Sequence, residues 1–111
     1  MALSTIGRMF DQHFRQGDLI SRYGGEEFAV ILPDTSLENA MTVCERLRKK
    51  VLSHRFKYNS SGFSISISIG IALYNNLVHR SSVELVSAAD QALYQAKKEG
   101  RNSVRYYPDN N

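Results

Sequence analysis

The sequence contains a single cysteine, Cys44, so an internal disulfide is excluded and a reducing compartment is favoured. It has no apolar run approaching the roughly 18–20 residues of a membrane span. Its N-terminus lacks the charged and then apolar segments of a signal peptide. We therefore expect a cytoplasmic segment without membrane contact, which is compatible with a longer parent protein that is membrane-anchored elsewhere.

Patterns typical of soft-metal sites and of nucleic-acid readers are also missing. His13, His54 and His79 show no metal-ligand spacing, and there is no Cys-x-x-Cys pair. The net charge of +3 is too mild for a dense basic stripe, and the six tyrosines are not interleaved with basic residues. This balance fits a small anionic ligand better than a nucleic-acid polymer, although solubility alone accounts for the charge.

The length of 111 residues limits the chain to one domain, and 42% hydrophobic residues supports a packed core. Helical periodicity and capping signals predict three helices: one at 2–14, one that a capping box of Thr35 and Glu38 begins, and one that a box of Ser81 and Glu84 begins and Gly100 ends. The expected strands are 18–23, 26–32, 63–74 and 103–107, with a loop at 54–62. The order α-β-β-α-β-α-β is typical of a ferredoxin-like or palm-type α+β fold.

Expected core stripes follow from the same periodicity. They comprise Leu37, Ala40, Met41, Cys44, Leu47 and Val51 in the second helix, and Leu85, Val86, Ala89, Ala92, Leu93 and Ala96 in the third. In the strand at 63–74, large apolar residues alternate with a face of Ser64, Ser66, Ser68, Gly70 and Ala72.

Two glycines, Gly24 and Gly25, separate the first two expected strands and predict a tight hairpin. Glu26 and Glu27 follow directly, at the start of the outgoing strand. Two adjacent carboxylates repel each other unless a cation lies between them, and bare backbone lets a phosphate or sugar approach closely. The pattern indicates a divalent metal with a phosphorylated ligand, against the alternative of a solvated strand end.

Four segments carry a resemblance to a known family. Gly24-Gly25-Glu26-Glu27-Phe28 resembles the signature of the GGDEF family, the diguanylate cyclases, in its GGEEF form. Ser66-Ile67-Ser68-Ile69-Gly70, Asp90-Gln91-Ala92-Leu93-Tyr94-Gln95-Ala96-Lys97 and Gly100-Arg101-Asn102 resemble later patterns of the family, in the right order. The resemblance implies that residues 1–111 are a partial GGDEF domain, roughly its last two-thirds, lacking its first strand and helix.

The resemblance implies a reaction in which two GTP molecules meet across a homodimer and condense into cyclic di-GMP and pyrophosphate. It implies Glu26 and Glu27 as catalytic carboxylates and ligands of Mg²⁺ or Mn²⁺, without assigning the general base. At Gly24 and Gly25 the nucleotide would pass along bare backbone, and Lys97 and Arg101 would hold its phosphates. The plainer interpretation of this pair is two cations favoured by a helix C-terminus.

Arg22 precedes the turn, where it would assist phosphate binding or pair with a neighbouring carboxylate. Arg15 and Asp18 resemble the family's inhibitory site for its product, with Arg46 as a third member. Arginine and aspartate match the hydrogen-bonding edges of guanine. An Arg–Asp pair that closes the turn after the first helix is the structural alternative.

The implied absence of the first strand leads to two expectations. The segment that precedes the helix at 2–14 in the family carries a metal-binding aspartate and guanine-reading residues, so the chain alone is expected to be inactive. The strands at 26–32 and 63–74 would lose their shared neighbour; they should pair directly, or a second copy should insert a segment between them and make the chain self-associate.

The alternatives to a diguanylate cyclase are a non-catalytic module that binds cyclic di-GMP and a palm-type enzyme with another substrate.

Overall fold

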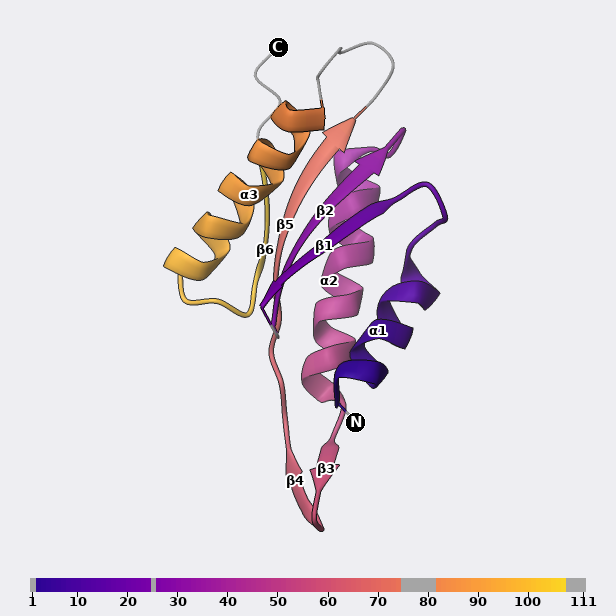
Figure 1. Ribbon diagram of the computed structural model, residues 1–111, viewed down its shortest axis with the longest axis vertical. Helices are drawn as coiled ribbons and strands as arrows, with labels where there is room; N and C mark the ends of the chain where they lie inside the picture. The colour runs from indigo at the N-terminus through magenta and orange to yellow at the C-terminus, as the bar shows by residue number, and fades with distance from the viewer. Residues whose placement is uncertain (1, 25, 75–81, 108–111) are drawn as a thin grey trace.

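The protein is built on a four-stranded sheet with the strand order β1-β2-β5-β6. The computed structural model describes residues 2–24, 26–74 and 82–107. Within them the chain runs through α1 (Ala2–His13), β1 (Leu19–Gly24), β2 (Glu27–Pro33), α2 (Leu37–Ser53), β3 (Phe56–Tyr58), β4 (Ser61–Phe63), β5 (Ser68–Tyr74), α3 (Ser82–Lys98) and β6 (Val104–Tyr106). This α+β arrangement with a mixed sheet is consistent with the predicted palm-type fold, and Figure 1 shows it from one side.

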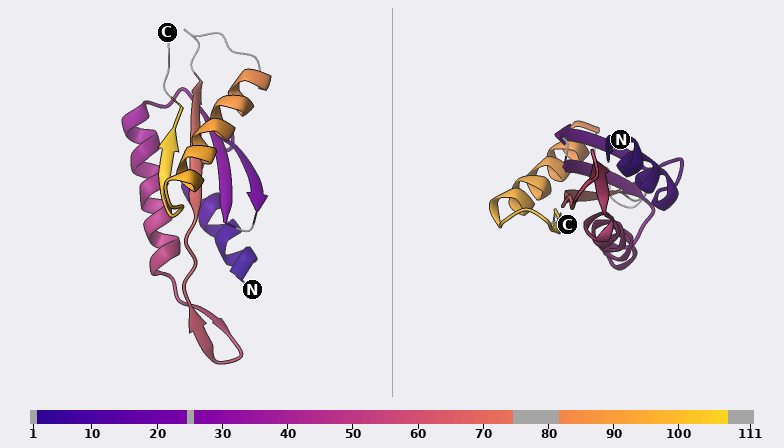
Figure 2. Two further views of the ribbon diagram at one scale, coloured as in Figure 1. Left: turned by 90° about the vertical axis from the view of Figure 1, so that its left-hand side faces the viewer. Right: turned by 90° about the horizontal axis from the view of Figure 1, so that it is seen from below.

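Helices cover both faces of the sheet, because its central strands are apolar on both sides (Figure 2). On one face α1 and α2 pack against Phe28, Val30 and Leu32 of β2, which alternate with Ala29 and Ile31 on the other face under α3. The thiol of Cys44, on the buried face of α2, is fully enclosed in the larger core.

The strands β2 and β5 pair directly, as the sequence led us to expect. They run parallel over seven residue pairs, from Glu27 opposite Ser68 to Pro33 opposite Tyr74. In a sheet whose neighbouring strands are all antiparallel, the two strands on either side of a third strand run in the same direction. If those two strands pair directly, they therefore form a parallel pair. The central positions of the sheet are therefore filled by these two strands.

The predicted loop at 54–62 and the predicted continuous strand at 63–74 were both wrong in part. β3 and β4 form a small antiparallel hairpin, in which Phe56 lies opposite Phe63 and their rings stack 5.8 Å apart. Asn59 and Ser60 form its turn with φ of 49° and 72°. The ladder of β5 starts only at Ser68 because its partner strand β2 starts at Glu27, although Ile67 before it is fully buried.

Two smaller expectations need correction. Ser36, not Thr35, caps α2, since its side chain accepts a hydrogen bond from the backbone N–H of Asn39. Val86 is 41% exposed and Ala88 is buried in its place, because α3 faces the sheet through a slightly rotated stripe. On the small-residue face of this strand, Ser68, Gly70 and Ala72 are buried because α3 packs against β5, a point on which the sequence analysis made no prediction.

The remaining expectations about the elements hold where the chain is described. The hairpin strands and the helix at 2–14 agree with the structure to within one or two residues at each end. The predicted capping residue Ser81 and the turn residue Gly25 lie outside the described residues. Among the described helices, none combines the length and the hydropathy that crossing a membrane requires.

Candidate functional site

The hairpin turn and the C-terminal end of α3 meet at the same end of the sheet (Figure 1), and three predicted site residues contact one another there. The carboxylate of Glu27 accepts a hydrogen bond from Arg101, with 2.8 Å between Oε2 and Nη1. Its other oxygen, Oε1, lies 3.4 Å from Nζ of Lys97. One carboxylate thus binds both cations that the sequence assigned to phosphate.

The electrostatics of Glu27 follow from these contacts. Its side chain is 22% exposed. Partial burial raises the pKa of the Glu27 carboxyl, but the hydrogen bonds and charges of Arg101 and Lys97 outweigh burial and leave the pKa below its ordinary value. The carboxylate is therefore ionised at neutral pH and occupies the place where an anionic ligand would meet the two cations.

Arg101 reaches the hairpin because α3 ends in a Schellman motif. Gly100, at φ 111°, donates its N–H to the carbonyl of Lys97, and the N–H of Arg101 bonds to the carbonyl of Ala96 at 2.8 Å. The chain then turns back toward β6. Helix end and turn together place Lys97 and Arg101 on the side that faces the hairpin.

The turn itself contributes Gly24 and Arg22. A Cβ at Gly24 would lie 3.2 Å from Oε1 of Glu27, so a side chain there would crowd the carboxylate. Arg22 donates from Nε to the Gly24 carbonyl and lies over the Phe28 ring, 5.1 Å from its centroid. These contacts hold Arg22 along the hairpin, beside the site. Nothing is described of Gly25.

A divalent metal fits this turn only in part. Glu26 is exposed there and offers the oxygen ligands that Mg²⁺ and Mn²⁺ prefer. Glu27 would first have to leave Lys97 and Arg101 to act as a second ligand. Within residues 2–24, 26–74 and 82–107, no group of three or more acidic, histidine or cysteine side chains is placed so that it could hold a metal ion.

Two of the three residues predicted for the product site, Arg15 and Asp18, contact each other. Nη2 of Arg15 lies 3.2 Å from Oδ1 of Asp18, and the same nitrogen donates to the Pro33 carbonyl and to Thr35 Oγ1. The pair borders a pocket of about 180 Å³ between α1, β2 and α2. Arg46 is exposed further along α2 and does not line this pocket. The ion pair closes the turn after α1, as the structural alternative required.

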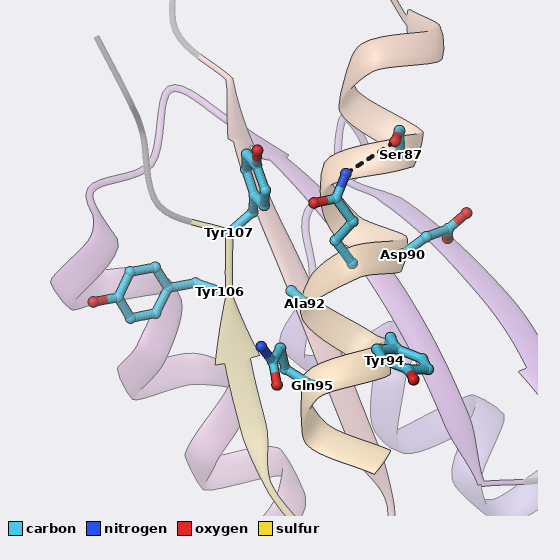
Figure 3. A pocket seen from close by; sticks show the side chains of 8 residues that line it. Ser87, Asp90, Ala92, Tyr94, Gln95, Tyr106 and Tyr107 are labelled. Carbon is cyan, nitrogen blue, oxygen red and sulfur yellow. Dashed lines mark hydrogen bonds between the residues drawn. The ribbon is translucent and has the colours of Figure 1, made fainter. Parts of the chain in front are cut away.

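A pocket of about 540 Å³ beside α3, which sequence reasoning missed, is larger than the one at Arg15 (Figure 3). Tyr106, the last residue of β6, and Tyr107, which follows it, line the pocket on one side of α3, while Asp90 projects from the other side of the helix. A hydrogen bond with Asp90 is the main cause that raises the pKa of the Tyr23 phenol, and burial and the Asp90 charge add to it. Asp90 therefore ties α3 to the hairpin. Its spacing from Tyr23 along the chain carries no local signal.

Comparison with known proteins gives a consistent result. The family described as "Diguanylate cyclase, GGDEF domain" matches residues 1–103. Diguanylate cyclase A of Treponema denticola is 38% identical over 110 residues, which are 99% of this chain and 29% of that protein. Diguanylate cyclase DgcP of Pseudomonas aeruginosa is 39% identical over 102 residues, 92% of this chain and 15% of that protein. The chain spans less than a third of these curated relatives.

Solved structures agree with the fold. The active GGEEF domain of a diguanylate cyclase from Vibrio cholerae superposes with a TM-score of 0.75 at 28% identity, covering 97% of this chain and 67% of that one. The GGDEF domain of DgcB from Caulobacter crescentus, solved in complex with c-di-GMP, gives a TM-score of 0.71 at 26% identity, with coverages of 96% and 63%.

Proposed function

The chain belongs to the GGDEF family of diguanylate cyclases, and from this premise we propose that it supplies the phosphate-binding part of a site in which two GTP molecules condense into cyclic di-GMP and pyrophosphate. One observation supports the proposal most directly: Lys97 and Arg101 converge on Glu27 at the Gly-Gly turn. Arg101 lies 74 residues after Glu27 in the sequence, and only the fold brings the two cations to this carboxylate.

The proposed recognition step is an exchange of anions. In the ligand-free chain the Glu27 carboxylate forms ion pairs with both Lys97 and Arg101. The β- and γ-phosphates of GTP carry more charge and more acceptor oxygens than a carboxylate, so they would replace Glu27 on both cations. The exchange releases the Glu27 carboxylate beside Glu26, where the reacting 3′-hydroxyl of the partner nucleotide is expected.

Positioning and charge neutralisation are what this reaction requires of the protein. Bare backbone at Gly24 gives the phosphates room, and Glu26 would hold a phosphate-bound Mg²⁺ or Mn²⁺. When bound, such an ion supplies charge neutralisation at the phosphates and eases ionisation of the attacking hydroxyl. We propose a homodimer as the active form, because each GTP attacks the other across two copies.

A direct test measures GTP binding and turnover separately. We expect Lys97→Ala to weaken GTP binding at least about tenfold, because one charge-assisted contact is lost. Lys98→Ala removes the neighbouring, exposed lysine at the same helix end and should leave binding unchanged. Equal effects of the two variants would contradict the proposed phosphate site.

We expect the chain alone to form little or no cyclic di-GMP from GTP and Mg²⁺. Glu26 is the one exposed carboxylate of the described turn, and one carboxylate alone would position the metal and the nucleotide poorly. Correct positioning is worth about 7–11 kcal/mol of the barrier, so its loss would nearly abolish the reaction. The measurement is product analysis by chromatography. Robust synthesis that Glu26→Ala abolishes would show that the residues of this chain suffice and would overturn the expectation.

The second candidate function is a regulatory module that binds cyclic di-GMP at Arg15 and Asp18. The pocket beside this pair and the 61% exposure of the Arg15 side chain favour it. We expect Arg15→Ala to weaken cyclic di-GMP binding about tenfold or more, and Lys97→Ala to have a smaller effect, because the two cations lie in different places. Calorimetric titration with cyclic di-GMP distinguishes them, and equal losses would favour a purely structural Arg15–Asp18 pair.

A further inference from the structure

The turn that presents Arg101 has an unfavourable backbone. Gly100, Arg101 and Asn102 follow one another with φ of 111°, 64° and 46°. Glycine adopts such left-handed conformations readily and asparagine tolerates them, but for arginine they cost free energy. A conformation of this kind persists only where neighbouring groups hold it, and it is typical of functional positions. The conformation of this turn therefore depends on the residues that contact it.

Arg48 of α2 reaches the turn from the far side. Its Nη1 donates to Oδ1 of Asn102 at 2.9 Å, and its Nε donates to Oε1 of Glu45 at 2.6 Å. The Arg48 side chain is only 15% exposed. Glu45 therefore fixes the plane of the guanidinium, and the guanidinium fixes the Asn102 side chain, through the rigid fork of donors that distinguishes arginine from lysine.

Ser68 completes the support from the sheet. Its hydroxyl accepts a hydrogen bond from the N–H of Asn102 at 3.1 Å, and its own N–H donates to the carbonyl of Glu26 at 2.9 Å. The residue is 2% exposed. One buried serine thus connects the turn that carries Arg101 with the strand end that carries the two glutamates.

We propose that Arg48 is a positioning residue for phosphate recognition, acting through Asn102 to hold the turn that aims Arg101 into the phosphate site. Arg48 itself does not contact the site, since its described side-chain partners are Glu45 and Asn102. Without it, the hydrogen bond from the Asn102 N–H to Ser68 is the one contact of this kind that Asn102 keeps among the described residues, and the unfavourable turn relaxes. Arg101 then leaves Glu27. This inference rests on the proposed function, because Arg101 serves that same site.

The first experiment observes Arg101 without any ligand. Nitrogen-15 NMR of arginine guanidinium groups detects restricted rotation when a guanidinium is held by a carboxylate. We expect restricted Arg101 signals in the wild-type chain and freely rotating ones in Arg48→Ala, with Arg48→Lys intermediate. Lys49→Ala, the exposed neighbour on the same helix, is the control and should match the wild type. Unchanged Arg101 signals in a folded Arg48→Ala would overturn the inference.

The second experiment titrates the chain with inorganic pyrophosphate as the probe. We expect Arg48→Ala to weaken binding about tenfold, as for one misplaced charge-assisted contact, and Lys49→Ala to leave it unchanged. If Arg48→Ala does not fold, Ser68→Ala removes only the hydroxyl and should loosen Arg101 in the same direction. Loss of stability without a change at Arg101 or in pyrophosphate affinity would refute positioning. A wild-type chain that binds no pyrophosphate would refute the phosphate site instead, and the NMR result would still decide the role of Arg48.

Discussion

Glu27 links the two halves of the candidate site through charge. Its carboxylate is the shared partner of a cation inside the last turn of α3 and a cation beyond it. Adjacent to it, Glu26 has the same chemistry but is exposed. Two neighbouring glutamates of the same motif therefore have different environments, and this difference depends on contacts more than sixty residues away in the sequence.

This environment predicts a pH dependence of stability. Because the pKa of Glu27 is lowered on folding, its ion pairs stabilise the fold above the unfolded-state pKa, near 4.5, and the contribution is lost as the pH falls through the folded-state value. We expect Glu27→Gln to remove a contribution of about 1 kcal/mol or less at neutral pH and to flatten the acid limb. Urea unfolding between pH 2 and 7 measures it. Glu99→Gln, at an exposed ion pair, is the control, and equal curves for both variants would refute the prediction.

At the scale of elements, the sequence predicted those whose signals are local. The helix at 2–14, the hairpin strands and the C-cap at Gly100 follow from residue type and spacing. The sequence did not predict the break before Ser68, because alternation continues through Ile65 and Ile67 where no neighbouring strand is available for pairing. The roles of Lys97 and Arg101 entered only through family resemblance, and their ion pairs with Glu27 were not predicted, because no local pattern relates residues 27, 97 and 101.

The packing of α3 on β5 gives a prediction at this scale. A Cβ at Gly70 would lie 2.2 Å from the backbone N of Leu93 and 2.4 Å from the carbonyl oxygen of Ala89. Backbone cannot move aside, so we expect Gly70→Ala to cost about 3 kcal/mol of unfolding free energy. Gly7→Ala, which meets nothing within 4 Å in α1, should instead gain roughly 0.5–1 kcal/mol. Chemical denaturation compares them, and a neutral Gly70→Ala would contradict the close approach.

At the scale of the whole molecule, the direct pairing of β2 with β5 lets one chain complete the centre of its own sheet. We therefore expect amide-exchange protection in these two strands to be independent of protein concentration over about two orders of magnitude, since an internal ladder needs no second copy. Hydrogen-exchange mass spectrometry measures it, with α1 as the internal reference. Protection of β2 and β5 that rises with concentration would indicate an inserted strand from another copy.

The buried thiol described beneath α2 has a separate consequence for the kinetics of the molecule. Burial, with smaller contributions from the charges of Asp18 and Glu45, raises the pKa of Cys44 to about 12, so hardly any thiolate exists in the native state. Alkylating reagents react with thiolate, and Cys44 is the only cysteine of the chain. Labelling therefore requires the core to open. The rate of modification reports the population of the open state when closing is faster than labelling, and the opening rate itself when labelling is faster.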